Sequence, residues 1–268
     1  MGRIEERFAQ LRRRNKKAFI AFITAGDPNL QITRELILSF PSVGVDILEL
    51  GVPFSDPLAD GATIQSASER ALSQSVSLLK ILELTKQIDR KRRPPLVLFT
   101  YYNPVHKLGI ERFVELSAKA SIEGLIIPDL PLEEAEEVRK FLHRREMDLI
   151  LLLAPTTKKE RMKIICQHSQ GFIYYISRLG TTGARDTLPS DLKEKIKEIR
   201  KITSKPIAVG FGVSTSAQVK QIEDMGADGV VVGSAIVKVI EENLGRRDLL
   251  KRVLSFIEEL RGENFVKG

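Results

Sequence analysis

The sequence predicts an α/β protein, a closed (β/α)8 TIM barrel with eight parallel strands. The chain has 268 residues, and a barrel of this kind typically needs about 250. Short β-branched runs alternate with amphipathic helical stretches along its whole length, and this alternation builds right-handed βαβ units with a parallel sheet. An open, doubly wound sheet stays as the alternative, because a strand count taken from sequence is uncertain.

Eight apolar runs carry the predicted strands. They are Ala18–Thr24, Asp46–Leu50, Leu96–Thr100, Gly124–Ile127, Asp148–Leu153, Phe172–Ser177, Pro206–Gly210 and Gly229–Gly233. Helical patterns lie between them, for example over Glu133–Arg145, Leu192–Lys201 and Ser214–Met225.

The sequence predicts two helices in addition to those of a minimal barrel. Ile4–Arg14 precedes the first strand and is expected to close the bottom of the barrel. After the second strand the pattern indicates two helices, Thr63–Leu72 and Ser77–Arg90, where one would suffice. No linker or break in composition divides the chain, so we expect one domain over residues 1–268.

The composition is that of an ordinary soluble protein, with 29% charged and 43% hydrophobic residues. The single cysteine, Cys166, excludes an internal disulfide and suits a reducing compartment. No apolar run approaches the roughly 20 residues that span a bilayer, and the N-terminus lacks the apolar core of a signal peptide. The expected location is cytoplasmic.

The net charge of +7 raises the question of nucleic-acid binding. Basic clusters occur at Arg12-Arg13-Arg14, Lys16-Lys17 and Lys91-Arg92-Arg93. No aromatic residues interleave with them to form a stacking platform. The composition therefore favours solvated helix ends and turns over a nucleic-acid interface.

The most informative stretch runs from Leu48 to Gly61 and reads LELGVPFSDPLADG. It is a buried strand that carries a carboxylate, Glu49, followed by a loop with two more, Asp56 and Asp60. Burying a carboxylate is costly unless it is paired or protonated. A Glu whose head merely reaches solvent at the strand end is the alternative.

Other polar residues follow strands at the same end of the predicted barrel, where barrel enzymes place their chemistry. Tyr101 and Asn103 follow the third strand, and Asp129 follows the fourth. Tyr174 and Tyr175 alternate along the sixth, so only one of them can point inward. Strand aromatics more often pack than react, which keeps a structural role open for both.

Two glycine-bearing turns predict a phosphate site. The seventh strand ends in Gly210-Phe211-Gly212 and the eighth in Gly233-Ser234, each just before a helix. Glycine lets backbone N–H groups approach an anion, and a helix N-terminus adds partial positive charge. Barrels frequently bind phosphate with these two loops, although turns need glycine in any case.

Several other chemistries lack their motifs. The three histidines, His106, His143 and His168, have no partner at metal-ligand spacing, so no metal site is predicted. The chain has no nucleophile elbow and no Walker or Rossmann motif.

The stretch Glu49–Gly61 closely resembles the motif of the tryptophan synthase alpha subunit family, and the resemblance extends over essentially the whole chain. It implies a cofactor-free lyase that cleaves indole-3-glycerol phosphate to indole and glyceraldehyde 3-phosphate in tryptophan biosynthesis. It implies that Glu49, Asp60 and Tyr174 are catalytic, with Tyr174 the inward tyrosine. The residues it implies for the substrate phosphate are Gly183, Gly212, Gly233 and Ser234.

The resemblance also carries expectations about acidity and partners. Desolvation is expected to raise the pKa of Glu49, whereas Asp60, on a more polar loop, is expected to stay ionised. A beta subunit is expected as partner in an alpha2beta2 heterotetramer, with the Asp56 loop at the interface. Segment Arg178–Leu188 has the composition of a mobile lid, or of a simple flexible loop.

Two other functions stay open. The chain is a candidate activating partner of a beta subunit with weak or lost lyase activity of its own, or a barrel aldolase or isomerase for another sugar phosphate. It departs from the family pattern in two places: Ala62 stands where a proline is common, and Ser121-Ile122-Glu123-Gly124 replaces a more usual glycine-containing turn.

Overall fold

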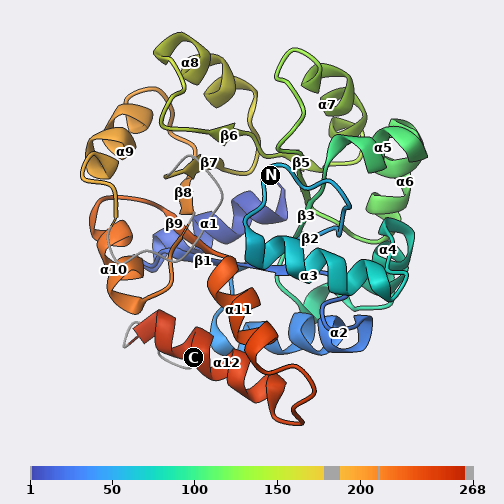
Figure 1. Ribbon diagram of the computed structural model, residues 1–268. Helices are drawn as coiled ribbons and strands as arrows, with labels where there is room; N and C mark the ends of the chain where they lie inside the picture. Colours follow the sequence, from blue (N-terminus) through green and yellow to red (C-terminus); the bar gives the residue numbers. More distant parts are fainter. Residues whose placement is uncertain (1, 178–187, 211, 263–268) are drawn as a thin grey trace.

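The computed structural model describes residues 2–177, 188–210 and 212–262, and these form a barrel of parallel strands ringed by helices (Figure 1). All strand pairs are parallel, in the order β5-β4-β3-β2-β1-β9-β8-β7-β6. The strands are β1 Ala18–Thr24, β2 Ile47–Gly51, β3 Leu96–Phe99, β4 Gly124–Ile126, β5 Asp148–Leu149, β6 Leu152–Leu153, β7 Ile173–Ile176, β8 Ile207–Gly210 and β9 Gly229–Val232.

The helices confirm the expected alternation, with boundaries that shift by one or a few residues. They are α1 Arg3–Arg13, α2 Leu30–Ser39, α3 Ala62–Ser73, α4 Leu78–Lys86, α5 Tyr102–Leu108, α6 Ile110–Lys119, α7 Ala135–His143, α8 Lys159–His168, α9 Leu192–Arg200, α10 Ser216–Asp224, α11 Ser234–Glu242 and α12 Leu249–Arg261. Two short 3-10 helices, η1 (Phe40–Val43) and η2 (Arg90–Arg92), precede β2 and β3.

The expected fifth strand, Asp148–Leu153, is one extended segment that changes partner half-way. Its first half, β5, pairs with β4, and its second half, β6, pairs with β7. The Ile150 N–H donates to Leu125 O at 2.9 Å, and the Tyr174 N–H donates to Leu151 O at 3.3 Å. The segment thus belongs to both ends of the strand order, which closes the sheet into a ring.

Side chains supply part of the hydrogen bonding at this closure. The Leu149 N–H donates to Oε1 of Gln170 at 3.2 Å, and the Leu151 N–H donates to Oγ of Ser169 at 2.9 Å. The Ser169 hydroxyl in turn donates to Phe172 O. Two residues just before β7 therefore replace main-chain partners that the split strand lacks.

Helix α1 closes the N-terminal end of the barrel, as expected. Its apolar face of Ile4, Phe8 and Leu11 is buried and joins the cluster inside the strands. The Phe8 and Phe172 rings lie 5.7 Å apart. In Figure 1, α1 crosses the middle of the ring that the other helices form.

Two helices follow β2, as the sequence predicted, but the second ends earlier than expected. Helix α4 begins after Ser77, whose hydroxyl accepts a hydrogen bond from the Lys80 N–H. It stops at Lys86, and Asp89 then caps η2 by accepting from the Lys91 N–H at 2.9 Å. The local Asp cap starts a new turn where the sequence pattern suggested a continuous helix.

Candidate active site

A pocket at the C-terminal ends of the strands brings most of the predicted site residues together. Its wall carries Phe22, Glu49, Ala59, Asp60, Gly61, Ile64, Phe99, Tyr174, Gly212, Val231, Gly233 and Ser234. These residues come from five strands, from three of the loops that follow strands, and from the first turns of α3 and α11. The pocket lies at the end of the barrel where enzymes of this fold place their chemistry.

Glu49 is the most unusual group in the pocket. Along β2 the residue two positions before it, Ile47, packs inside the barrel, so the period-two alternation also turns Glu49 inward. The side chain is fully buried, and neither carboxyl oxygen has a hydrogen-bond partner within the described residues. Burial raises the pKa of Glu49 to about 8. The carboxyl is therefore mostly protonated at neutral pH, as the desolvation argument predicted.

Tyr174 is the inward tyrosine, as expected. It packs in the cluster inside the strands, whereas Tyr175 packs in the layer between the strands and the outer helices. Burial, reinforced by the nearby Glu49 carboxyl, raises the pKa of the Tyr174 hydroxyl well above its ordinary value. The hydroxyl is thus neutral and available as a hydrogen-bond donor beside Glu49.

The environment of Asp60 is more buried than the polar loop predicted from the sequence. It lies in the loop between β2 and α3, and burial raises its pKa to about 6, while a hydrogen bond with Tyr101 acts in the opposite direction. The Tyr101 hydroxyl also accepts from the Ala59 N–H at 3.0 Å, and its ring stacks on Phe54 with centroids 5.2 Å apart. Tyr101 thus holds the loop and favours the ionised carboxyl, whereas burial favours the neutral form, so Asp60 is mostly ionised at neutral pH but close to its titration range.

The phosphate loops reach the same pocket. Gly212 has φ of 78°, a conformation that favours glycine, and Gly233 precedes the first turn of α11, which begins at Ser234. Gly233 itself has φ of −122°, so no positive φ constrains it. Helix α11 has no side-chain N-cap, which suits anion binding by its first N–H groups.

No lysine of α11 reaches the phosphate loops, and one predicted phosphate residue lies outside the described part of the chain. Lys238, one turn into α11, is exposed and pairs with Glu242 at 3.8 Å rather than lining the pocket. Gly183 and nearly all of the expected lid Arg178–Leu188 lie outside the described residues.

Two carboxylates named from the sequence do not join the pocket. Asp129 accepts a hydrogen bond from the Tyr102 N–H at 2.8 Å, at the start of α5. Asp56 is exposed and accepts from the neighbouring Ser55 hydroxyl.

The sequence analysis missed the aromatic walls of the pocket. Phe22 and Phe99 meet edge to face with centroids 5.6 Å apart. Phe22 follows Ala18 and Ile20 along β1 at a spacing of two, which was the available signal for an inward position. Such walls fit a flat apolar ligand group next to the carboxyls.

Among the described residues, no group of three or more His, Cys, Asp or Glu residues has the arrangement of a metal site. No helix in the described part of the chain combines the length and apolar character of a membrane span.

Comparison with known proteins decides the family. The model of the tryptophan synthase alpha chain family matches residues 8–263. The chain belongs to this family. It is 46% identical to the tryptophan synthase alpha chain of Caldanaerobacter subterraneus subsp. tengcongensis, over 97% of this chain and 99% of that one. It is 43% identical to the chain from Arabidopsis thaliana, over 96% of this chain and 94% of the other.

Solved structures of tryptophan synthase alpha chains share the fold. The subunit from Legionella pneumophila superposes with a TM-score of 0.88 at 34% identity and covers 97% of each chain. Tryptophan synthase from Mycobacterium tuberculosis also gives 0.88 at 34%, over 97% of this chain and 96% of that one. These matches confirm the barrel, and membership of the family makes the chain an enzyme of tryptophan biosynthesis.

Proposed function

We propose that this chain is a carbon–carbon lyase that cleaves indole-3-glycerol phosphate to indole and glyceraldehyde 3-phosphate without a cofactor. The observation that carries the proposal is Glu49, a buried carboxyl at the wall of the pocket that has no hydrogen-bond partner among the described residues and whose pKa is raised to about 8. A carboxyl of that acidity is protonated at neutral pH, and a single group in this state delivers a proton and afterwards receives one.

In the proposed reaction, Glu49 first gives its proton to the indole carbon that bears the glycerol chain. The bond between that carbon and the chain then breaks, and its electron pair restores the aromatic indole. The adjacent hydroxyl of the chain becomes the aldehyde carbonyl and returns its proton to the Glu49 carboxylate. The reaction is redox-neutral, and Glu49 ends in the state in which it began.

Asp60 and Tyr174 support these steps in the proposal. Protonating the ring makes the indole nitrogen electron-poor, and the carboxylate of Asp60 stabilises the positive charge that develops there. Asp60 is mostly ionised at neutral pH, since its pKa is about 6. The Tyr174 hydroxyl, neutral and next to Glu49, orients that carboxyl.

The rest of the pocket fits the two ends of such a substrate. Phe22 and Phe99 provide apolar walls for the flat ring. The N-terminus of α11 with Gly233 and Ser234, together with Gly212, provides backbone donors for the phosphate. Gly183 stays a predicted phosphate contact from the resemblance.

We also propose a tryptophan synthase beta subunit as the partner, in an alpha2beta2 complex. The relative from Mycobacterium tuberculosis was solved as tryptophan synthase. On this chain, Leu58 is 90% exposed in the loop after β2, where the resemblance places the interface. The single-domain organisation and the cytoplasmic location stay predictions.

One assay tests the function against its alternatives. Indole release from indole-3-glycerol phosphate is measured for the purified chain, with and without a beta subunit. Release by the chain alone, increased by the beta subunit, supports the lyase. Release only in the complex favours an activating partner, and no release under either condition with turnover of another sugar phosphate favours a different barrel enzyme.

A further inference from the structure

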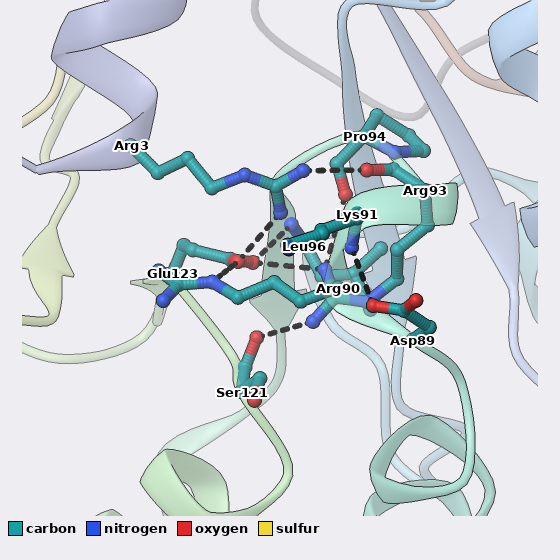
Figure 2. A network of polar contacts seen from close by, with 9 residues as sticks. All are labelled: Arg3, Asp89, Arg90, Lys91, Arg93, Pro94, Leu96, Ser121 and Glu123. Atoms are coloured by element: carbon teal, nitrogen blue, oxygen red, sulfur yellow. Dashed lines mark hydrogen bonds and ion pairs between the residues drawn. The ribbon is translucent and has the colours of Figure 1, made fainter.

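Three arginines converge on one buried carboxylate at the N-terminal end of the barrel (Figure 2). Arg3 of α1, Arg90 of η2 and Arg93 bind Glu123 at 2.8, 2.8 and 3.0 Å. Glu123 is 4% exposed and also accepts from the Leu96 N–H at 2.7 Å, at the start of β3. The cluster Lys91-Arg92-Arg93, which the composition suggested was a solvated turn, is therefore anchored in the interior through Arg93.

The cluster carries more positive charge than its acid neutralises. One carboxylate faces three guanidinium groups, and Arg93 is 2% exposed. Burial lowers the pKa of Arg93, the Glu123 carboxylate acts in the opposite direction, and the like charges of Arg3 and Arg90 lower the pKa further. The buried Nε of Arg93 has no hydrogen-bond partner within the described residues. An additional anion would relieve this repulsion.

A cavity of about 420 Å³ adjoins the cluster. Its cationic lining residues are Arg3, Arg7, Lys91, Arg92 and Arg93. Its acidic lining residues are fewer, Glu6 and Asp46, and Asp46 already binds Arg7 at 2.6 Å and the Phe19 N–H at 2.7 Å. Neither Lys91 nor Arg92, both exposed, takes part in an ion pair among the described residues. Their charges are free to meet a ligand.

The cavity is separate from the candidate active site. Its residues belong to α1, η1, η2 and the segments that lead into β2 and β3. The active-site pocket is formed by strand ends and the loops that follow strands. Because all the strands are parallel, the two sites lie at opposite ends of the barrel.

We propose that this cavity binds the phosphate group of a small molecule, as a second anion site that plays no part in the cleavage reaction. Guanidinium groups present paired N–H donors that match phosphate oxygens. The volume is that of a small-ligand site, and the walls include Pro41, Pro94 and Pro95, which hold the shape rigid. No aromatic side chain lines the cavity, so it lacks the stacking platform of a single-stranded nucleic-acid site.

The test measures inorganic phosphate binding by calorimetry at constant ionic strength. The full-length chain is compared with a Lys91→Ala/Arg92→Ala variant and with a Lys193→Ala/Lys197→Ala control, which loses the same charge from exposed positions on α9. We expect the cavity variant to bind at least about tenfold more weakly at one site, because charge-assisted bonds are lost. The control is expected to match the unmodified chain.

Steady-state kinetics separate this site from the catalytic phosphate site. The cavity variant is expected to keep its kcat and its KM for indole-3-glycerol phosphate within about twofold, as expected for charges remote from the reaction. Equal phosphate binding by all three proteins would overturn the proposal. A KM that rises in parallel with the loss of phosphate binding would overturn it too. So would a single-stranded RNA oligonucleotide that binds the unmodified chain more tightly than phosphate does and no longer binds the cavity variant.

Discussion

The ring of Tyr174 fills the space that a side chain on Gly210 would need. A β-carbon built on Gly210 would lie 2.7 Å from the Tyr174 hydroxyl oxygen and 2.8 Å from its Cε2. The two residues sit on the neighbouring strands β7 and β8, and Ile176 is the register partner of Gly210. The position of Tyr174 beside Glu49 thus depends on a missing methyl group one strand away.

Gly210→Ala is expected to displace Tyr174 and lower the rate of indole release. The new methyl group forces either the ring or the strand to move, and small displacements in an active site cost large factors in rate. The measurement is kcat/KM for indole release, with circular dichroism as a folding control. In a Tyr174→Leu background the same substitution should cost much less, and an equal cost in both backgrounds would contradict a direct effect on Tyr174.

Glu49→Gln is expected to lower indole release by a factor of at least about 10², the lower end for a general acid–base group. The amide is nearly isosteric but transfers no proton. Phosphate binding at the active site should stay close to that of the unmodified chain. A variant that retains more than about a tenth of the turnover would remove Glu49 from the acid–base role.

The same substitution is expected to stabilise the fold at neutral pH. The pKa of Glu49 is about 8 in the folded chain, against an ordinary value of 4.5. Between these pH values the carboxyl ionises in the unfolded chain but stays protonated in the folded one, so the folded state loses stability as the pH rises. Gln is neutral throughout and escapes this cost, which is on the order of 3 kcal/mol at pH 7. Urea unfolding of both proteins should show a difference that is small near pH 4 and grows up to pH 8. A difference independent of pH would refute the desolvation argument.

The pH profile of kcat/KM is expected to be bell-shaped, with limbs near the two raised pKa values of about 6 and about 8. Activity falls below the lower value as Asp60 becomes protonated and above the upper value as Glu49 ionises. Asp60→Asn should abolish the acidic limb and raise the barrier by about 2.7–4 kcal/mol, the typical cost of removing one electrostatic stabiliser. An unchanged acidic limb in that variant would assign the limb to another group.

Gly233→Val is expected to raise KM strongly, and Lys238→Ala to leave it nearly unchanged. A β-carbon on Gly233 would meet Cβ of Phe22 at 3.3 Å, and the branched side chain would enter the proposed phosphate site. Lys238 is exposed and paired with Glu242. Steady-state kinetics decide the point, since the opposite order of the two KM values would show that a lysine holds the phosphate.

The fold and the centre of the pocket were accessible from sequence because their determinants are local. Apolar runs and amphipathic periods predicted the strands and most helices to within a few residues. The burial of Glu49 followed from its position on an apolar strand. The role of each site residue stays a prediction, because the geometry places groups together without showing a reaction.

The sequence predictions were wrong where residues distant in the sequence determine the environment of a side chain. The loop that carries Asp60 is polar in sequence, but folding buries this carboxyl and places it beside Tyr101, which lies 41 positions away. Arg93 was expected in a solvated turn, but its acidic partner Glu123 is 30 positions away. The exchange of partners within the fifth strand also depends on contacts between segments remote in sequence.

Because of that exchange of partners, single side-chain substitutions can weaken the closure of the barrel. Main-chain ladders survive almost any substitution, but here Oγ of Ser169 and Oε1 of Gln170 accept two of the N–H groups of the segment. Removing the Ser169 hydroxyl leaves the Leu151 N–H without its acceptor, at a cost of about 1–3 kcal/mol. In Ser169→Ala, amide hydrogen exchange should therefore accelerate first along this seam, so that the ring opens there while its other strands remain paired.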